Sequence, residues 1–234
     1  MRFKKIVSIV LFYTLIISIF LTATYWGSAA TTAIAEMIPL ERQHTIIIDA
    51  GHGGEDGGAI SCTGRAESTY NLEIALRLND LMHLLGMHTH MIRSTDISVY
   101  THGETIAAKK VSDLKNRVNL VNNAENALLL SIHQNTFTEK QYSGAQVFYA
   151  SKGEGQQLAE ELQTVFCQTI NRGSNRRSKR GEGVYLLEHI DKTGVLIECG
   201  FLSNPIEEAK LSDKVYQQKL ICIIGSTVCN FLDR

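Results

Sequence analysis

The chain has 234 residues, of which 44% are hydrophobic and 20% are charged, which is the composition of an ordinary globular protein. Its formal net charge is −1, so no excess of basic residues indicates a nucleic-acid partner. Only two prolines are present and no repeat or low-complexity tract is found, which argues against a disordered tail. The length fits one domain of about 190 residues behind a short leader.

The N-terminal segment differs from the rest of the chain. Basic residues at positions 2, 4 and 5 precede an uncharged apolar run over residues 6–26. At about 1.5 Å per residue, a helix over this run would just span the hydrocarbon core of a bilayer. We therefore expect residues 1–35 to be a signal peptide, with Ala33 and Ala35 marking a cleavage site, or an uncleaved membrane anchor; a buried core helix is the alternative. A signal or an anchor predicts an exported, extracytoplasmic protein, either secreted or membrane-anchored.

Strand-like and helix-like patterns alternate along the remainder, residues 36–234. In chain order we expect a strand over 45–49, a helix over 67–86, a strand over 87–93, a helix over 112–124, strands over 127–133 and 145–150, a helix over 154–171, strands over 183–188 and 193–200, and a final helix over 214–232. This alternation predicts a single α/β domain with a twisted, mainly parallel sheet covered by helices on both faces. The five cysteines include no CxxC pair, and we expect no disulfide.

Polar residues lie at the ends of three of these strands. His52 follows the first strand inside the glycine-rich stretch "AGHGGEDGG", His133 ends "ALLLSIH", and Glu198 follows "GVLI". Glu67 opens the helix after the first strand. Because the carboxyl ends of parallel strands meet at one edge of a sheet, these four residues can converge. Two histidines and a carboxylate are a common ligand set for one catalytic Zn²⁺, so His52, Glu67 and His133 are candidate ligands and Glu198 is the candidate general base.

Each candidate also has a simpler interpretation. A single histidine after a strand is more often a solvated or capping residue, and Glu67 suits a helix N-terminus, where the helix dipole favours an acid. Glu73 is a competing ligand, and Glu198 could pair with a base such as Arg93. The candidate ligands are far apart in the chain and form no compact HExxH motif, so their spacing leaves these alternatives open.

Four segments carry a resemblance to a known family. "IIIDAGHGGEDGGA", "ESTYNLEIALRL", "SIHQNTF" and "VLIECGFLSNPIEEAKL" resemble, in the same order, the motifs of the zinc-dependent N-acetylmuramoyl-L-alanine amidases, the type 3 amidase family. The resemblance implies that residues 36–234 form a zinc amidase catalytic domain, that His52, Glu67 and His133 bind zinc, and that Glu198 is the catalytic glutamate. It also implies hydrolysis of the amide that joins N-acetylmuramic acid to L-alanine in peptidoglycan.

Within the family, "YSGAQVFYA", the basic stretch over residues 171–181 and the apolar N-terminal segment resemble the germination-specific cortex amidases of endospore formers. That resemblance implies a role in spore cortex maturation leading to muramic-δ-lactam, at the forespore envelope. Two departures occur: Gln134 and Cys199 stand where small residues are common in the family. Neither replaces a predicted ligand.

Three further hypotheses concern the surroundings of the site. Asn135 lies two residues beyond His133 and so points to the same side of a continuing strand, and we expect it and Arg93 to orient the substrate. An open site with three protein ligands binds metal less tightly than a closed four-ligand site, so an accessory protein could control metal loading. The basic residues of 171–181 could contact an anionic wall polymer, peptide carboxylates or a protein partner, or could form only a solvated loop.

Two other functions compete with the amidase. One is a wall-binding pseudoenzyme, although a pseudoenzyme usually lacks at least one of the four polar site residues, which are all present here. The other is a different metal-dependent peptidoglycan hydrolase or a deacetylase on a similar sheet. Free peptide with N-terminal alanine would identify an amidase, and acetate would identify a deacetylase.

Overall fold

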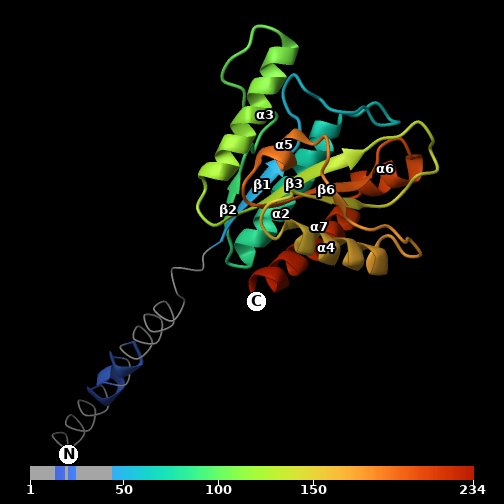
Figure 1. Ribbon diagram of the computed structural model, residues 1–234. Coiled ribbons are helices and arrows are strands. Elements are labelled where there is room, and N and C mark those ends of the chain that lie inside the picture. Colours follow the sequence, from blue (N-terminus) through green and yellow to red (C-terminus); the bar gives the residue numbers. More distant parts are fainter. Residues whose placement is uncertain (1–13, 19–20, 25–43) are drawn as a thin grey trace, which may run out of the picture. The chain divides into compact units, whose positions relative to one another are not determined.

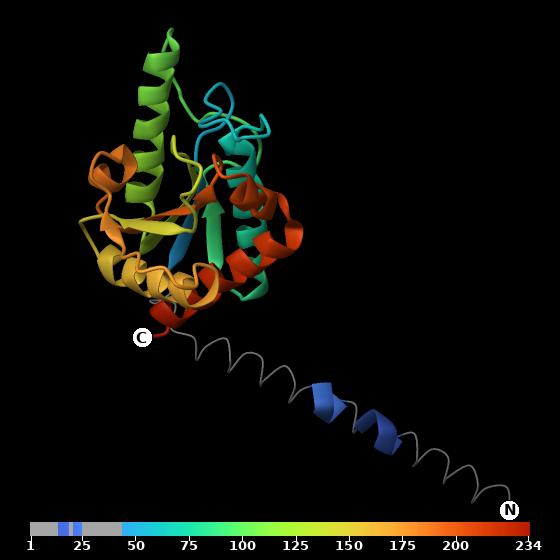
Figure 2. The ribbon, with the colours of Figure 1, turned by 90° about the vertical axis from the view of Figure 1, so that its right-hand side faces the viewer.

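The computed structural model describes residues 14–18, 21–24 and 44–234 (Figures 1 and 2). Residues 44–234 form one compact unit. Most of the expected leader, residues 1–35, lies outside the described residues, as does its predicted cleavage site. Within the described part of the chain, no helix combines the length and apolar character needed to cross a membrane.

A six-stranded sheet forms the centre of this unit, with the strand order β2-β1-β3-β6-β4-β5. The strands are β1 (Thr45–Ala50), β2 (His88–Met91), β3 (Ala127–Asn135), β4 (Gln146–Tyr149), β5 (Lys179–Arg180) and β6 (Thr193–Phe201). Strands β2, β1, β3 and β6 are parallel to one another, and β4 runs antiparallel to β6. The predicted mainly parallel sheet is therefore confirmed.

Helices cover both faces of the sheet, as the sequence predicted. The helices are α2 (Glu67–Leu84), α3 (Ile106–Asn123), α4 (Gly155–Thr169), α5 (Tyr185–His189), α6 (Pro205–Ser212) and α7 (Lys214–Leu232). Successive residues of a strand point to opposite faces, so Ile46 and Ile48 join the larger apolar cluster, which contains residues of α2, α4 and α7. Ile47 joins a second cluster, which contains residues of α3 and α5. Figures 1 and 2 show α3 and α5 on one side of the sheet and α4 and α7 on the other.

Two element predictions differ from the structure by more than a few residues. The strand expected over 183–188 is wrong: this segment contains the short helix α5, which buries Leu186 and Leu187 in the second apolar cluster. A short apolar run does not distinguish a buried strand from one buried helical turn, which explains the error. Helix α3 begins at Ile106 rather than at 112, because the Thr105 side chain accepts a hydrogen bond from the Ala108 amide and caps the helix there.

Strands β3 and β6 are longer than expected, and this extension positions two candidate residues. His133 and Glu198 lie inside their strands, two and three residues before the strands end at Asn135 and Phe201, and they are partners in the parallel register. Neighbouring residues in register project to the same face of a sheet, so the two side chains start side by side.

Candidate functional site

The loop after β1 carries His52 in an unusual backbone conformation. His52 has φ 60°, in the left-handed region that most residues avoid. Two glycines on this loop make room for the neighbouring side chains. A Cβ at Gly51 would lie 2.1 Å from Nε2 of His133, and a Cβ at Gly58 would lie 2.6 Å from Oε2 of Glu67. The glycine-rich composition therefore follows from the close approach of the loop to the candidate ligands.

Two buried arginines hold the carbonyl groups of this loop. The Arg93 guanidinium donates to the carbonyls of Ala50 (2.8 Å) and Gly51 (3.0 Å), and it also reaches two further backbone carbonyls. Arg117 donates to the carbonyls of Ala50 (3.1 Å) and His52 (2.9 Å). Arg93 is 2% exposed, so the structure does not place it where the expected direct contact with a substrate could form. Arg93 instead stabilises the loop from its buried side, through these hydrogen bonds to backbone carbonyls.

Arg117 belongs to a buried charge cluster under the same loop. It forms ion pairs with Asp49 at the end of β1 and with Asp113 one turn earlier on α3. Burial alone would raise the pKa of Asp49, but the charge of Arg117 and a hydrogen bond from Ser131 hold that pKa below its usual value. Sequence reasoning singled out neither Asp49 nor Arg117. An acid closing an apolar strand, together with an arginine on the buried side of a helix, was the available signal.

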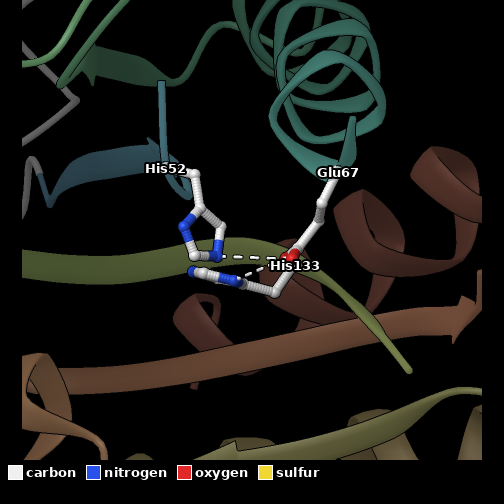
Figure 3. A group of neighbouring side chains, drawn as sticks. All are labelled: His52, Glu67 and His133. Atoms are coloured by element: carbon white, nitrogen blue, oxygen red, sulfur yellow. Dashed lines mark hydrogen bonds and ion pairs between the residues drawn. The ribbon is translucent and has the colours of Figure 1, made fainter. Parts of the chain in front are cut away.

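Glu67 is the residue on which both histidines converge. It is the first residue of α2, and its Oε1 lies 3.0 Å from Nδ1 of His133 while its Oε2 lies 3.3 Å from Nε2 of His52 (Figure 3). Burial favours the neutral acid, but hydrogen bonds from His133 and His52 outweigh it and hold the pKa of Glu67 well below its usual range. Three further donors reach the carboxylate, namely the amides of Ala59 and Gln134 and the side chain of Asn71.

The three predicted ligands therefore meet in space. Ligand atoms of His52, Glu67 and His133 lie within 4.8 Å of one another, and among the described residues this is the group of histidine, cysteine and acidic side chains that could hold a metal ion. Glu73, the competing ligand, is not part of it and pairs with Arg65 instead. The group comes from a loop, a helix terminus and a strand, which Figure 3 shows as three separate elements.

Asp56 adds a second carboxylate behind His52. Its Oδ2 lies 2.9 Å from Nδ1 of His52, and Lys110 approaches the same oxygen at 3.1 Å. Metal-binding histidines commonly donate the second ring N–H to a carboxylate, which fixes the tautomer and directs the other nitrogen to the metal. The hydrogen bond to Asp56 therefore favours the tautomer in which the lone pair of His52 Nε2 points toward Glu67 and can bind a metal. Sequence reasoning did not single out Asp56, although it follows His52 by four residues in the same loop.

Glu198 lies beside this group in β6. Its Oε2 is buried and has no hydrogen-bond partner in the described part of the chain, and the alternative pairing with Arg93 is not formed. Burial, reinforced by the charge of Glu67 and opposed by His133 and His52, raises the pKa of Glu198 to about 7. Two imidazole nitrogens, a carboxylate and an unpaired buried oxygen fit a catalytic metal site with an adjacent general base.

The remaining surroundings are partly open. A cavity of about 110 Å³ lies next to His52 and is lined by Asp56, Tyr100 and Lys109 among others. Asn135, predicted to orient the substrate, is the last residue of β3 and is half-buried, outside the group formed by the histidines and Glu67. The five cysteines are free thiols.

Comparison with known proteins identifies the family. A family profile described as N-acetylmuramoyl-L-alanine amidase matches residues 46–230. The chain belongs to this amidase family. The germination-specific N-acetylmuramoyl-L-alanine amidase of Bacillus subtilis is 38% identical to the amidase described here over 189 residues, covering 80% of this chain and 78% of that protein. LytC of B. subtilis is 31% identical over 178 residues, although the chain spans only 33% of LytC.

Solved structures agree with this placement. The CwlD amidase from Clostridioides difficile, determined in complex with the GerS lipoprotein, matches the present amidase with a TM-score of 0.77 at 35% identity, covering 81% of this chain and 98% of that one. An N-acetylmuramoyl-L-alanine amidase from Clostridium difficile 630 matches with a TM-score of 0.70 at 30% identity, over 82% of this chain and 98% of that one. The expected type 3 amidase family and fold are therefore confirmed, and the chain is an enzyme that cleaves peptidoglycan as an N-acetylmuramoyl-L-alanine amidase.

Proposed function

We propose that the amidase is zinc-dependent and that His52, Glu67 and His133 hold one Zn²⁺ per chain. The observation that carries this proposal is the convergence of Nε2 of His52 and Nδ1 of His133 on the Glu67 carboxylate, with Asp56 fixing the far nitrogen of His52. The nitrogen and oxygen donors are of the type found in catalytic zinc sites, in which three protein ligands leave a position open. Bound there, Zn²⁺ supplies Lewis-acid chemistry that activates water and polarises the substrate carbonyl.

Glu198 performs the proton transfers in this proposal. Its unpaired Oε2 accepts a proton from the water that attacks the carbonyl carbon of the lactyl group. The same oxygen then delivers that proton to the nitrogen of L-alanine as the C–N bond breaks. The products are the free lactyl carboxylate of muramic acid and a peptide with an N-terminal alanine. The burial of this carboxyl group beside the ligand group places it where a general base is needed.

We assign the biological role to spore cortex maturation. The support is the 38% identity to a germination-specific amidase, together with the similarity to the CwlD amidase. In this role, removal of the peptide precedes formation of muramic-δ-lactam, and the enzyme is exported and acts outside the cytoplasm at the forespore envelope. Residues 1–35 serve as its signal peptide or membrane anchor, and 36–234 form the catalytic domain.

A partner that controls metal loading fits the same assignment. The CwlD amidase of C. difficile was determined in complex with the lipoprotein GerS, so a similar amidase is known to associate with an accessory protein. We propose such a partner here, because an open three-ligand site leaves room for regulation of metal affinity. Half-buried Asn135 remains a proposed substrate contact at the end of β3.

The decisive experiment is digestion of purified peptidoglycan by the wild type and by Glu198→Gln after chelation and after re-addition of Zn²⁺. We expect chelation to abolish release of alanine-terminated peptide and zinc to restore it. Glu198→Gln should bind one zinc per chain and lose about 10²- to 10⁴-fold in kcat, the usual contribution of a general acid–base residue. Undiminished activity of Glu198→Gln would disprove the assigned mechanism, and release of acetate would indicate a deacetylase.

A further inference from the structure

A group of exposed aromatic and basic side chains lies beside the site on the loops that follow β3 and α4. We call it the aromatic–basic ledge and define it as Phe137, Tyr142, Arg172, Arg176 and Arg177. Phe137 is 49% exposed and Tyr142 is 40% exposed, although both are large apolar side chains. Exposed aromatic residues that cluster together on a soluble domain commonly mark a binding surface.

The aromatic part of the ledge is held in place by contacts between rings. Phe137 and Tyr142 form an edge-to-face pair with ring centroids 4.8 Å apart, and Tyr142 stacks on buried Phe201 at 6.2 Å. Arg176 also contacts Phe201: its guanidinium carbon lies over the Phe201 ring, 5.4 Å from the ring centroid. Because Phe201 ends β6, the two exposed rings are fixed to the strand that carries Glu198.

Hydrogen bonds attach both loops of the ledge to the same edge of the sheet. The amide of Phe137 donates to Ser203, and the side chain of Asn204 donates to the Tyr142 carbonyl, so the loop after β3 lies along the turn between β6 and α6. Figure 1 shows this loop beside α6. Arg176 donates to the carbonyl of Ser143 at 3.2 Å, which joins the basic loop to the aromatic one.

The ledge is continuous with the active site. Phe137 follows His133 by four residues, so even a fully extended chain would separate the two by at most about 13 Å. On the next strand, Gln146 is the register partner of Glu198, and its side chain donates to the carbonyl of Arg177 at 2.7 Å. One strand therefore separates the basic loop from the proposed catalytic glutamate.

The charges of the ledge are uncompensated. Arg172 and Arg177 are exposed, and neither forms an ion pair with a residue of the described chain. On the opposite flank, next to His52, the two lysines are already paired, Lys109 with Glu55 and Lys110 with Asp56. The ledge is thus the flank of the site that offers free positive charge together with exposed rings.

We propose that the aromatic–basic ledge binds the uncut peptidoglycan that adjoins the cleavage site, so that the enzyme acts preferentially on polymeric strands. The apolar C–H faces of hexosamine rings would pack on Phe137 and Tyr142, and the carboxylates of neighbouring peptides would meet Arg172 and Arg177. This proposal rests on the proposed function, in which the muramic acid at the cut is one sugar of a longer strand. The rest of the glycan must extend from the site along a neighbouring surface of the protein. The ledge begins at β3 and β6, the two β-strands that carry His133 and Glu198.

The test compares two substrates, an intact glycan strand carrying peptides and one disaccharide carrying one peptide. The measured quantity is the ratio of kcat/KM for the strand to kcat/KM for the fragment. We expect Phe137→Ala with Tyr142→Ala to lower this ratio about tenfold, since an aromatic contact contributes up to about one order of magnitude in affinity. Tyr142→Phe keeps the ring and should keep the ratio. Arg172→Glu with Arg177→Glu should lower it as well, and added salt should lower it for the wild type but much less for this variant.

Matched controls separate the ledge from general effects of substitution. Tyr185→Ala removes a half-buried aromatic residue that stacks on His189 in α5, and Lys214→Glu with Lys219→Glu reverses two exposed charges on α7. Both should leave the ratio unchanged. An unchanged ratio in the ledge variants, or an equal fall for both substrates, would overturn the proposal.

Binding to peptidoglycan can be measured in variants that do not cleave it, so the role of the ledge can be tested independently of catalysis. Each ledge substitution is combined with Glu198→Gln, and binding of the full chain to sedimented peptidoglycan is measured. Weaker binding of the ledge variants supports the ledge even where cleavage is absent, whereas unchanged binding contradicts it. Absence of cleavage of both substrates by the wild type would count against the proposed function alone.

Discussion

At the scale of single residues, the site is organised around one carboxylate. Glu67 contacts both histidines and is reached by two backbone amides and by Asn71, so its position is fixed from several directions. His52 is fixed in the same way, by Asp56 on its outer nitrogen. Glu198 is the opposite case, because its Oε2 has no partner in the described chain. Fixed ligands beside one unsatisfied acid are what a metal hydrolase needs, since geometry holds the metal and the free acid moves protons.

Asp56 provides the first prediction at this scale. Asp56→Ala should lower the affinity for Zn²⁺ about 10- to 100-fold while the protein stays folded, because His52 loses the acceptor that orients its ring. Competition with a chromophoric chelator measures this affinity. Glu55→Ala is the matched control, since Glu55 is the preceding acid and pairs with Lys109 rather than with His52. Equal zinc affinities of the two variants would refute the orienting role of Asp56.

Glu198 provides a prediction of pH dependence for the metal-free protein. Its pKa is raised from an ordinary value of 4.5 to about 7, so the folded state holds this proton more tightly than the unfolded state does. The folded state consequently loses stability as pH rises through this window, by up to roughly 3 kcal/mol. Glu198→Gln removes the ionisation and should therefore be more stable relative to the wild type at pH 8 than at pH 5. Thermal unfolding of both metal-free proteins measures the difference, and an identical difference at both pH values would contradict the assignment.

At the scale of elements, the segment that joins β1 to α2 determines whether the site forms. Asp49, Arg93 and Arg117 hold its beginning through a buried ion pair and a set of hydrogen bonds to backbone carbonyls. Gly58 then lets the segment pass close to the side chains of Glu67 and His52. The segment lacks regular structure, but the buried guanidinium groups of Arg93 and Arg117 donate hydrogen bonds to its first carbonyls and so fix where it begins.

Two glycines of this segment allow a matched comparison. Gly58 and Gly64 both have positive φ, 69° and 89°, so an alanine at either position carries a similar backbone cost of about 1 kcal/mol. Only at Gly58 would the added Cβ meet Glu67 and His52, at 2.6 and 2.7 Å, whereas at Gly64 nothing lies within 4 Å. Gly58→Ala should therefore lose most zinc binding and activity, and Gly64→Ala should lose only stability. Zinc stoichiometry and peptide release after purification measure both effects, and similar activities in the two variants would contradict the steric explanation.

At the scale of the whole molecule, the catalytic unit holds its own core. Among the described residues, the two apolar clusters draw their members from residues 46–232, and the sheet, the metal-site residues and the ledge lie within the compact unit His44–Arg234. A sheet buried on both faces gives such a unit most of its stability through apolar contact. The residues of the proposed active site and the apolar core that stabilises the fold therefore both belong to the unit His44–Arg234.

This arrangement predicts that a fragment of residues 44–234 folds and is active. We expect one cooperative thermal transition, one bound zinc per chain and peptidoglycan cleavage comparable to that of the full chain. Calorimetry and the peptide-release assay test this. A fragment that is unfolded or that binds no zinc would show that residues before 44 contribute to the catalytic unit.

The sequence by itself determined the fold class and the identity of the ligand candidates. Buried strands of a parallel sheet are apolar on both faces, so runs such as "TIIID" and "ALLLSI" are visible without a structure, and the polar residues at their ends mark the working edge. The family motifs then added roles for His52, Glu67, His133 and Glu198. What failed was local: the segment over 183–188 has an apolar pattern that both a strand and a helical turn satisfy.

Only the tertiary structure decided which groups touch. Arg93 and Glu198 are both charged residues near strand ends in the sequence, yet one is bound to backbone carbonyls behind the loop and the other has an unpaired oxygen beside the histidines. Asp56, Arg117 and the aromatic–basic ledge likewise acquire meaning only from contacts with residues distant in the chain or across a turn. Periodicity records which side of an element is buried, whereas hydrogen bonds, ion pairs and pKa values depend on distances between elements, and those distances exist only once the sheet has assembled.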